Sequence, residues 1–343
     1  MAATTEEAGQ GAQGITTSSN TGDRNPALSV VFPVFNERDN LNALHQRVSE
    51  AITETGLDYE LIFVDNGSVD GSLDVIKSLA AGDSHVRYIC LSRNFGHQGG
   101  LFAGLAGSHG DAVITMDADL QHPPSLIPRM VALWQEGHEV VYTTKTGHRM
   151  GALKGLQTKI FYRVMSKISG LNLSFGQSDY RLLDRKVLDA LLSIPEYRKF
   201  LRGTVEWMGF RQTGLELSVE ERHSGESKFS YRSLVSFALD GILAFSTMPL
   251  RWFIATGALV ALLAIAYAMY VTILALVEAM GGPVSVPPGW ASVAVAISFF
   301  GGVQLLGIGV LGEYLGRVFE QTKGRPVYIV RETSEDHDSG QRG

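Results

Sequence analysis

Short apolar runs alternate with amphipathic stretches over the first half of the chain. Four runs have the length of buried strands, and they are Leu28–Phe32, Glu60–Val64, Val86–Leu91 and Ala112–Met116. Between the first two, a stripe with the period of an α-helix is made by Leu41, Leu44, Val48 and Ile52. An apolar stripe of this kind packs a helix on a sheet. The pattern therefore predicts an α/β fold, with a βαβ series around a mostly parallel sheet.

Two uncharged runs follow near the C-terminal end, at residues 253–277 and 291–312, separated by a link rich in glycine and proline. About 20 apolar residues suffice to cross the hydrocarbon core of a bilayer. Two such runs in tandem favour a transmembrane hairpin over buried core helices. Lysine and arginine flank the hairpin on its outer sides and are absent between Glu278 and Trp290. This distribution predicts that both chain ends are cytoplasmic.

The patterns divide the chain into five parts. Residues 1–26 predict a disordered tail without a signal peptide, because they are rich in small and polar residues. The other parts are an α/β domain (27–228), an amphipathic segment (229–250), the hairpin (251–314) and a cytoplasmic C-terminal segment (315–343). Within the α/β domain, a further helix is predicted around Leu156–Ile168, and a second apolar stretch follows at Val187–Ile194. The amphipathic segment mixes aromatic and basic residues, which favours a helix in the lipid interface, with a helix packed on the α/β domain as the alternative.

Charge and single residue types exclude some functions. The net charge of −6 over 343 residues argues against nucleic acid as a partner. The single cysteine, Cys90, lies inside an apolar run and is interpreted as a buried structural thiol. The histidines His97, His109 and His122 have no metal-ligand spacing among themselves, and we interpret them as structural or surface residues.

Polar residues follow each of the four predicted strands, and the last strand carries the clearest chemistry. Asp117 and Asp119 come at its end, where a side-chain period of two aims both to one side, with the amide of Gln121 next in register. Ligands of open α/β sheets bind outside the carboxyl ends of the strands. Carboxylate and amide oxygens suit a hard cation, so the three residues predict a Mg²⁺ or Mn²⁺ site that faces a diphosphate. On its own, an Asp-x-Asp triplet is also common on solvated loops.

Four motifs, taken in order, resemble family 2 glycosyltransferases that act on polyprenyl phosphate. They are Pro33–Glu37 (PVFNE), Asp65–Ser68 (DNGS), Asp117–Pro124 (DADLQHPP) and Gly225–Phe229 (GESKF). The closing segment Gly312–Arg317 (GEYLGR) resembles the bactoprenol (undecaprenyl phosphate) glucosyltransferase branch, related to dolichol-phosphate-mannose synthases. The resemblance implies a Rossmann-like GT-A catalytic domain, a nucleotide-sugar donor, a lipid phosphate acceptor and inversion at the anomeric carbon.

On the donor side, the resemblance assigns a role to each candidate. Asp65 is expected to accept hydrogen bonds from the uracil or the ribose, and the base is expected to lie against Pro33, Asn36 and Glu37. Family members often have a second aspartate where this chain has Asn66. The metal bound by Asp117, Asp119 and Gln121 is expected to stabilise the departing nucleotide.

On the acceptor side, Asp179 matches the position usually proposed as the base in the family. A lipid phosphate monoester is already mostly dianionic near pH 7, because its second pKa is about 6. We therefore expect Asp179 to position the substrate rather than to deprotonate it. Arg222 and Lys228 are expected to bind phosphate, and Arg202 is a further candidate. The alternative for Lys228 is a cytoplasmic anchor with no role in the site.

The leading hypothesis is metal-dependent transfer of a hexose to undecaprenyl phosphate at the cytoplasmic face of the cell membrane, with UDP-glucose as the preferred donor. GDP-mannose, UDP-galactose, UDP-N-acetylglucosamine and a modified arabinose donor remain alternatives. A processive polysaccharide synthase needs a Gln-x-x-Arg-Trp motif, and this chain has Met248 in place of that glutamine. A non-catalytic membrane scaffold or lipid carrier is the alternative of another class. Glycines in the second apolar run favour close packing of spans, within one protomer or in a homo-oligomer.

Overall fold

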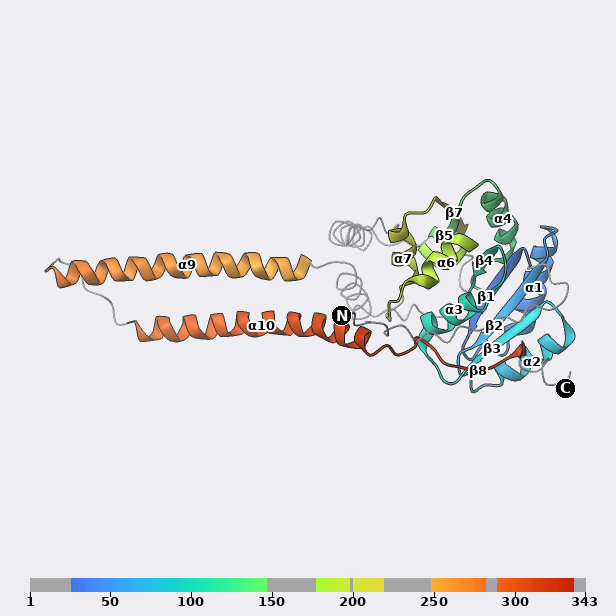
Figure 1. Ribbon diagram of the computed structural model, residues 1–343, viewed down its shortest axis with the longest axis horizontal. Helices are drawn as coiled ribbons and strands as arrows, with labels where there is room; N and C mark the ends of the chain where they lie inside the picture. The colour runs from blue at the N-terminus through green and yellow to red at the C-terminus, as the bar shows by residue number, and fades with distance from the viewer. Residues whose placement is uncertain (1–25, 147–176, 198–199, 219–247, 282–288, 336–343) are drawn as a thin grey trace, which may run out of the picture.

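The computed structural model describes residues 26–146, 177–197, 200–218, 248–281 and 289–335 (Figure 1). Within these residues, eight strands form one sheet in the order β7-β5-β6-β4-β1-β2-β3-β8. The strands are β1 (Leu28–Val34), β2 (Tyr59–Asp65), β3 (Val86–Leu91), β4 (Ala112–Thr115), β5 (Val140–Thr146), β6 (Gln177–Asp184), β7 (Gln212–Ser218) and β8 (Val330–Thr333). The first four confirm the strands predicted from the apolar runs, with small shifts at their ends.

The sheet is mixed and mostly parallel, as predicted. Strand β1 pairs in parallel with β2 and β4, and β2 pairs in parallel with β3. Strand β6 runs antiparallel to both β4 and β5, while β7 is parallel to β5. The carboxyl ends of β1 to β4 consequently meet at one edge of the sheet, where ligands of open α/β sheets bind.

Helices cover both faces of the sheet. On one face lie α1 (Leu41–Thr53), α2 (Ser72–Gly82), the short helix η1 (Pro124–Leu126) and α4 (Ile127–Gln135). On the other face lie α3 (Gly96–Ala106), α6 (Arg185–Ser193) and α7 (Leu201–Met208). The apolar stretch Val187–Ile194 lies largely within α6, whereas the predicted helix Leu156–Ile168 lies outside the described residues.

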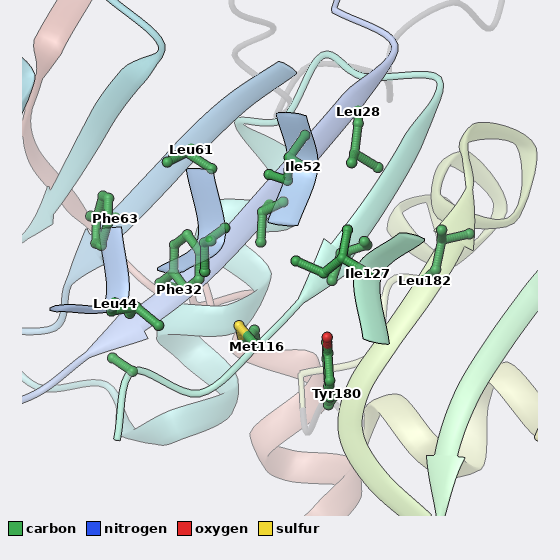
Figure 2. Close-up of a cluster of buried hydrophobic side chains, with 14 of the residues drawn as sticks. Leu28, Phe32, Leu44, Ile52, Leu61, Phe63, Met116, Ile127, Tyr180 and Leu182 are labelled. Atoms are coloured by element: carbon green, nitrogen blue, oxygen red, sulfur yellow. The ribbon is translucent and has the colours of Figure 1, made fainter. Parts of the chain in front are cut away.

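The core follows the predicted apolar stripe. All four residues of the stripe on α1 are buried, and Figure 2 shows Leu44 and Ile52 against the strand residues Phe32 and Leu61. The rings of Phe32 and Phe63 stack with centroids 4.8 Å apart. Burial of side chains of this size contributes about 1.5–3 kcal/mol each, so this cluster fixes α1 on the sheet.

On the opposite face, α3 approaches the sheet closely. A Cβ atom on Gly104 would lie 2.2 Å from Cγ1 of Val31 and 2.8 Å from Cγ2 of Val64. Only glycine fits at this crossing. The close approach sets the position of the first turn of α3, which lies at the carboxyl end of β3.

Two long apolar helices, α9 (Met248–Ala279) and α10 (Trp290–Thr322), run side by side away from the sheet (Figure 1). Within them, Trp252–Ala279 and Phe299–Thr322 are long and apolar enough to cross a membrane. The helices match the two predicted runs, although α10 continues past the predicted hairpin boundary at residue 314. The predicted tail up to residue 25, and the amphipathic segment up to residue 247, lie outside the described residues.

After α10 the chain returns to the sheet, which the sequence did not predict. Strand β8 pairs antiparallel with β3 and forms the edge of the sheet. The ammonium group of Lys77 on α2 lies 2.6 Å from Oε1 of Glu332, and the hydroxyl of Ser334 accepts a hydrogen bond from the backbone of Tyr88 at 3.2 Å. The C-terminal segment is therefore part of the α/β domain and not only an extension of the hairpin.

Candidate functional site

A pocket of about 390 Å³ opens at the carboxyl ends of the central strands. It is lined by Pro33, Phe35, Glu37, His97, Asp117, Ala118 and Asp119. Four of these residues, Pro33, Glu37, Asp117 and Asp119, belong to the site predicted from the sequence. The structure thus brings together residues that are more than eighty positions apart in the chain.

The loop after β4 presents the two aspartates. Strand β4 ends at Thr115, so both aspartates lie beyond it. Leu120 adopts a left-handed conformation with φ of 61°, which is uncommon for a residue with a branched side chain and marks a constrained turn. Because of this turn, the backbone N–H of Gln121 donates to Oδ1 of Asp119 at 3.1 Å. The strand alternation therefore ends before Gln121, whose side chain is exposed and does not line the pocket.

Negative charge is concentrated in the pocket. Partial burial raises the pKa of Glu37, and the carboxylates of Asp119, Asp70 and Asp117 raise it further, against a hydrogen bond from Asn40 that lowers it. The Nδ2 atom of Asn40 donates that bond to Oε2 of Glu37 at 2.6 Å. A divalent cation would relieve the repulsion among these carboxylates.

Asp117 and Asp119 fit a metal site to which the substrate also contributes ligands. In the described part of the chain, no group of three or more His, Cys, Asp or Glu side chains could hold a metal by itself. Magnesium is commonly bound by one or two carboxylates together with water and substrate phosphates. Asp117 and Asp119 fit this kind of site, in which the substrate completes the coordination. Gln121 as a third ligand stays a prediction.

His122 holds the backbone of Asp117 in place. It is 1% exposed, its Nδ1 accepts a hydrogen bond from the backbone N–H of Asp117 at 3.1 Å, and its Nε2 lies 2.9 Å from the hydroxyl of Ser178. Since Nδ1 accepts, the proton of the neutral ring is on Nε2, which donates to Ser178. The ring also stacks on Tyr180 with centroids 5.1 Å apart. His122 is thus a structural residue of the site, in line with its interpretation from the sequence.

His97 is the residue of the pocket that the sequence reasoning missed. It lies in the first turn of α3, and its side chain is 44% exposed. Its Nε2 lies 3.7 Å from Oδ1 of Asp117 and 3.5 Å from Oδ2 of Asp179. The contact with the Asp179 carboxylate and the charge of Asp117 raise the pKa of His97, although burial opposes them. Its only signal in the sequence is its place shortly after the end of a predicted strand.

Asp179, on β6, is held by a bidentate ion pair. The Nε and Nη2 atoms of Arg202 donate to its two carboxylate oxygens at 2.8 and 3.0 Å. Burial alone raises the pKa of Asp179, but the contacts with His97 and Arg202 outweigh it and hold the pKa well below its usual range. A carboxylate in this state is a poor proton acceptor. The expected role of Asp179 in positioning the substrate stays a prediction.

The remaining donor-side candidates lie in the loops around the pocket. Asp65 is 1% exposed, and its Oδ1 accepts a hydrogen bond from the backbone N–H of Ser68 at 3.2 Å. Its Oδ2 lies 3.5 Å from the thiol of Cys90. Asn36 has a φ of 58°, and its Oδ1 accepts from the backbone of Val69 at 2.9 Å, which ties the loops after β1 and β2 together. Contact of Asp65 and Asn36 with a nucleotide stays a prediction.

The three expected cations and the cysteine are the last candidates from the sequence. Arg222 and Lys228 lie outside the described residues. Arg202 binds Asp179, and its role toward a phosphate stays a prediction. Cys90 is fully buried, and burial raises the pKa of its thiol to about 11, as expected of a structural residue.

Known proteins resemble this chain over most of its length. Residues 29–192 match the family model described as glycosyl transferase family 2. An uncharacterized glycosyltransferase from Synechocystis sp. is 41% identical over 305 residues, which are 88% of this chain and 94% of that one. A bactoprenol glucosyl transferase of Shigella phage SfX is 38% identical over 305 residues, 89% of this chain and 98% of its own.

Among solved structures, a mannosyltransferase from Pyrobaculum calidifontis, in complex with GDP-Man and Mn²⁺, is 15% identical with a TM-score of 0.43. The alignment covers 87% of this chain and 86% of that one. A likeness at this level carries no argument about the pocket.

Proposed function

This chain belongs to glycosyltransferase family 2, and we propose that it transfers a hexose from a nucleoside diphosphate sugar to a polyprenyl phosphate. The observation that carries the proposal is the pocket, where Glu37, Asp117 and Asp119 gather carboxylates at the carboxyl ends of the strands. Relatives named bactoprenol glucosyl transferase, 38% identical over almost their whole length, support undecaprenyl phosphate as the acceptor and glucose as the sugar. We infer UDP-glucose as the donor, with the other hexose nucleotides as alternatives.

On the donor side, Asp117 and Asp119 would hold Mg²⁺ or Mn²⁺, which supplies positive charge at the diphosphate of the departing nucleotide. His122 fixes the backbone of Asp117, so the carboxylate keeps its place when charge develops. The pocket wall at Pro33 and Phe35 offers apolar surface for the nucleoside. These residues bind and orient the donor, and leaving-group stabilisation is the main task of the site.

On the acceptor side, the lipid phosphate brings its own nucleophile, because its second pKa of about 6 leaves it mostly dianionic near pH 7. No strong base is needed. Asp179 keeps its charge in the pair with Arg202 and orients that guanidinium at the site. Arg202, together with Arg222 and Lys228, is proposed to bind the phosphate, which then attacks the anomeric carbon with inversion.

The apolar helices support a reaction at a membrane. The helices α9 and α10 both contain segments long and apolar enough to cross a bilayer. Basic residues lie outside the predicted spans on both sides, which supports a cytoplasmic catalytic domain and cytoplasmic chain ends at the cell membrane. The donor is water-soluble and the acceptor is a lipid, so the pocket must open near the cytoplasmic surface.

The test is transfer of radiolabelled sugar to undecaprenyl phosphate by the purified full chain in detergent. A panel of UDP- and GDP-sugars is compared with Mn²⁺, with Mg²⁺ and with EDTA. We expect metal-dependent product from one donor, and loss of product in the Asp117→Asn and Asp119→Asn variants. Asp189→Asn, on the exposed side of α6, makes the same chemical change away from the pocket and serves as the control. No product from any donor, or full turnover by both pocket variants, would favour a non-catalytic scaffold or lipid carrier.

A further inference from the structure

His97 is the one residue among the seven that line the pocket whose side chain carries an N–H group. The other polar members of this lining are the carboxylates of Glu37, Asp117 and Asp119, which accept hydrogen bonds when ionised. A nucleoside diphosphate sugar is rich in acceptor oxygens. Among the residues that line this pocket, the imidazole is therefore the natural hydrogen-bond donor for such a substrate.

The distances around His97 leave this N–H available to a ligand. Its Nε2 lies 3.7 Å from Asp117 and 3.5 Å from Asp179, and both distances exceed those of a good N–H···O hydrogen bond, about 2.7–3.2 Å. The ring thus lies between the proposed metal ligand and the Asp179–Arg202 pair. An oxygen of the substrate in the pocket can approach Nε2 more closely than either carboxylate does.

The position of His97 depends on a buried amide in the neighbouring loop. Asn66 follows β2 and is 2% exposed. Its Oδ1 accepts a hydrogen bond from the backbone N–H of Phe95 at 2.9 Å, and its Nδ2 donates to the carbonyl of Gly96 at 2.9 Å. One side chain therefore binds a backbone group of each of the two residues that precede His97, at the start of α3.

Close packing keeps this amide in place. A Cβ atom on Gly67 would lie 2.8 Å from the backbone of Arg93 and Asn94, and Gly67 has a φ of 76°. A Cβ atom on Gly100 would lie 3.4 Å from Nδ2 of Asn66. The loop after β2 and the start of α3 thus interlock around the Asn66 side chain.

An amide and a carboxylate are not equivalent at this position. A carboxylate can still accept from the N–H of Phe95, but it cannot donate to the carbonyl of Gly96, and its charge would face that oxygen. Aspartate at residue 66 would consequently push the peptide before His97 away.

We propose that His97 donates a hydrogen bond to the nucleoside diphosphate sugar in the pocket, and that Asn66 is a positioning residue that acts through His97. This inference rests on the proposed function. It gives a role to a histidine interpreted from the sequence as a structural or surface residue, and to an asparagine at a position where family members often have an aspartate.

The experiment is a double-mutant cycle in the hexose-transfer assay, with kcat and KM for the donor measured on the full chain in detergent. His97→Ala is expected to lower kcat/KM by about 10-fold to 100-fold, the range for a hydrogen bond to a charged group. His97→Gln retains an N–H donor and is expected to recover part of the loss. Asn66→Asp is expected to lower kcat/KM by about 10-fold in the parent chain, and to have almost no effect in the His97→Ala background.

Asn94→Asp is the matched control. Oδ1 of Asn94 accepts a hydrogen bond from the backbone N–H of Gly96 at 2.7 Å, and an aspartate retains that acceptor. The same chemical change at residue 94 should therefore leave the kinetics unchanged. Thermal unfolding checks that each variant is folded, and Asn66→Ala repeats the cycle if Asn66→Asp unfolds.

Activity of the parent chain separates the two hypotheses, because its absence refutes the proposed function itself. If the parent chain is active, a kcat/KM of the His97→Ala variant within about twofold of the parent value would refute contact between His97 and the donor. Losses from Asn66→Asp that simply add to those of His97→Ala would show that Asn66 does not act through His97.

Discussion

The Glu60 carboxylate is expected to make the stability of the domain sensitive to acid. It lies at the amino end of β2, at the opposite end of the sheet from the pocket, and it is 5% exposed. The hydroxyl of Ser29 and the backbone N–H of His109 donate to its Oε1 at 2.6 and 2.7 Å, and Arg87 pairs with its Oε2. Burial alone raises the pKa of Glu60, but the hydrogen bonds from His109 and Ser29 and the charge of Arg87 lower it from 4.5 to about 2.

The size and sign of the effect follow from this pKa. A decrease from 4.5 to about 2 corresponds to about 3 kcal/mol, at about 1.4 kcal/mol per unit. Because the pKa is lowered in the folded state, this stability is fully present above about pH 4.5 and is lost as the pH falls toward 2. Glu60→Gln removes the charge, so we expect it to destabilise the chain by about 3 kcal/mol at pH 7 and by progressively less below pH 4.5.

The assay is thermal unfolding of the full chain in detergent between pH 7 and pH 3. For a domain of this size, about 3 kcal/mol corresponds to a decrease in Tm of about 6–12 °C. Glu50→Gln, on the exposed side of α1, is the control, and hexose transfer by Glu60→Gln at pH 7 should remain normal. An unchanged Tm at pH 7, or a difference from the parent that does not shrink below pH 4.5, would refute the reasoning.

Three further predictions concern the ion pair, the α3 crossing and β8. Arg202→Met is expected to destabilise the chain by about 2 kcal/mol. This is less than the loss expected on breaking a fully buried ion pair, because the Arg202 side chain is 34% exposed. A Tm equal to that of the parent chain would contradict this prediction. Gly104→Ala should cost about 1–3 kcal/mol or more through its contact with Val31, whereas Gly82→Ala has open space and should not lower the Tm. Truncation after Gly324 removes β8 and exposes the edge of β3, so we expect a lower Tm and more aggregation. Thermal unfolding with light scattering measures both, and unchanged values would show that β8 contributes little.

The sequence predicted the strands that carry their own hydrophobic signal. Strands β1 to β4 are continuous apolar runs, because helices cover them on both faces. Strand β6 gave no such signal, since its sequence QSDYRLLD is half polar. It is nevertheless almost entirely buried, and its Asp179 is compensated by Arg202 on α7. Partners of this kind, separated by 23 positions in the chain, become visible only in the fold.

The same distinction applies to the pocket. Asp117 and Asp119 carry a local motif, so the sequence alone could single them out. The position of Gln121 was predicted from strand alternation, which the left-handed turn at Leu120 interrupts. His97 lies far from Asp117 in the sequence, and it enters the pocket because the fold brings the first turn of α3 to the loop after β4.

The end of α10 connects the apolar helices to both sides of the site. In its last turn, the side chain of Gln321 accepts a hydrogen bond from the backbone of Tyr197 at 2.8 Å and donates to the carbonyl of Pro195. Both residues lie in the connection that leads to α7 and Arg202. Seven residues beyond Gln321, Tyr328 packs against the hydrophobic cluster to which α3, the helix that carries His97, contributes Leu101 and Phe102.

These contacts restrict how the pocket can move relative to α10. A domain joined to a membrane helix by a free linker would present its pocket to the lipid in many orientations. Here the chain leaves α10, packs through Tyr328 against the cluster shared by α3 and α7, and joins the sheet as β8. A restricted orientation would favour the proposed transfer, because the pocket would stay close to the lipid phosphate. The C-terminal segment supplies that constraint through Gln321, Tyr328 and β8.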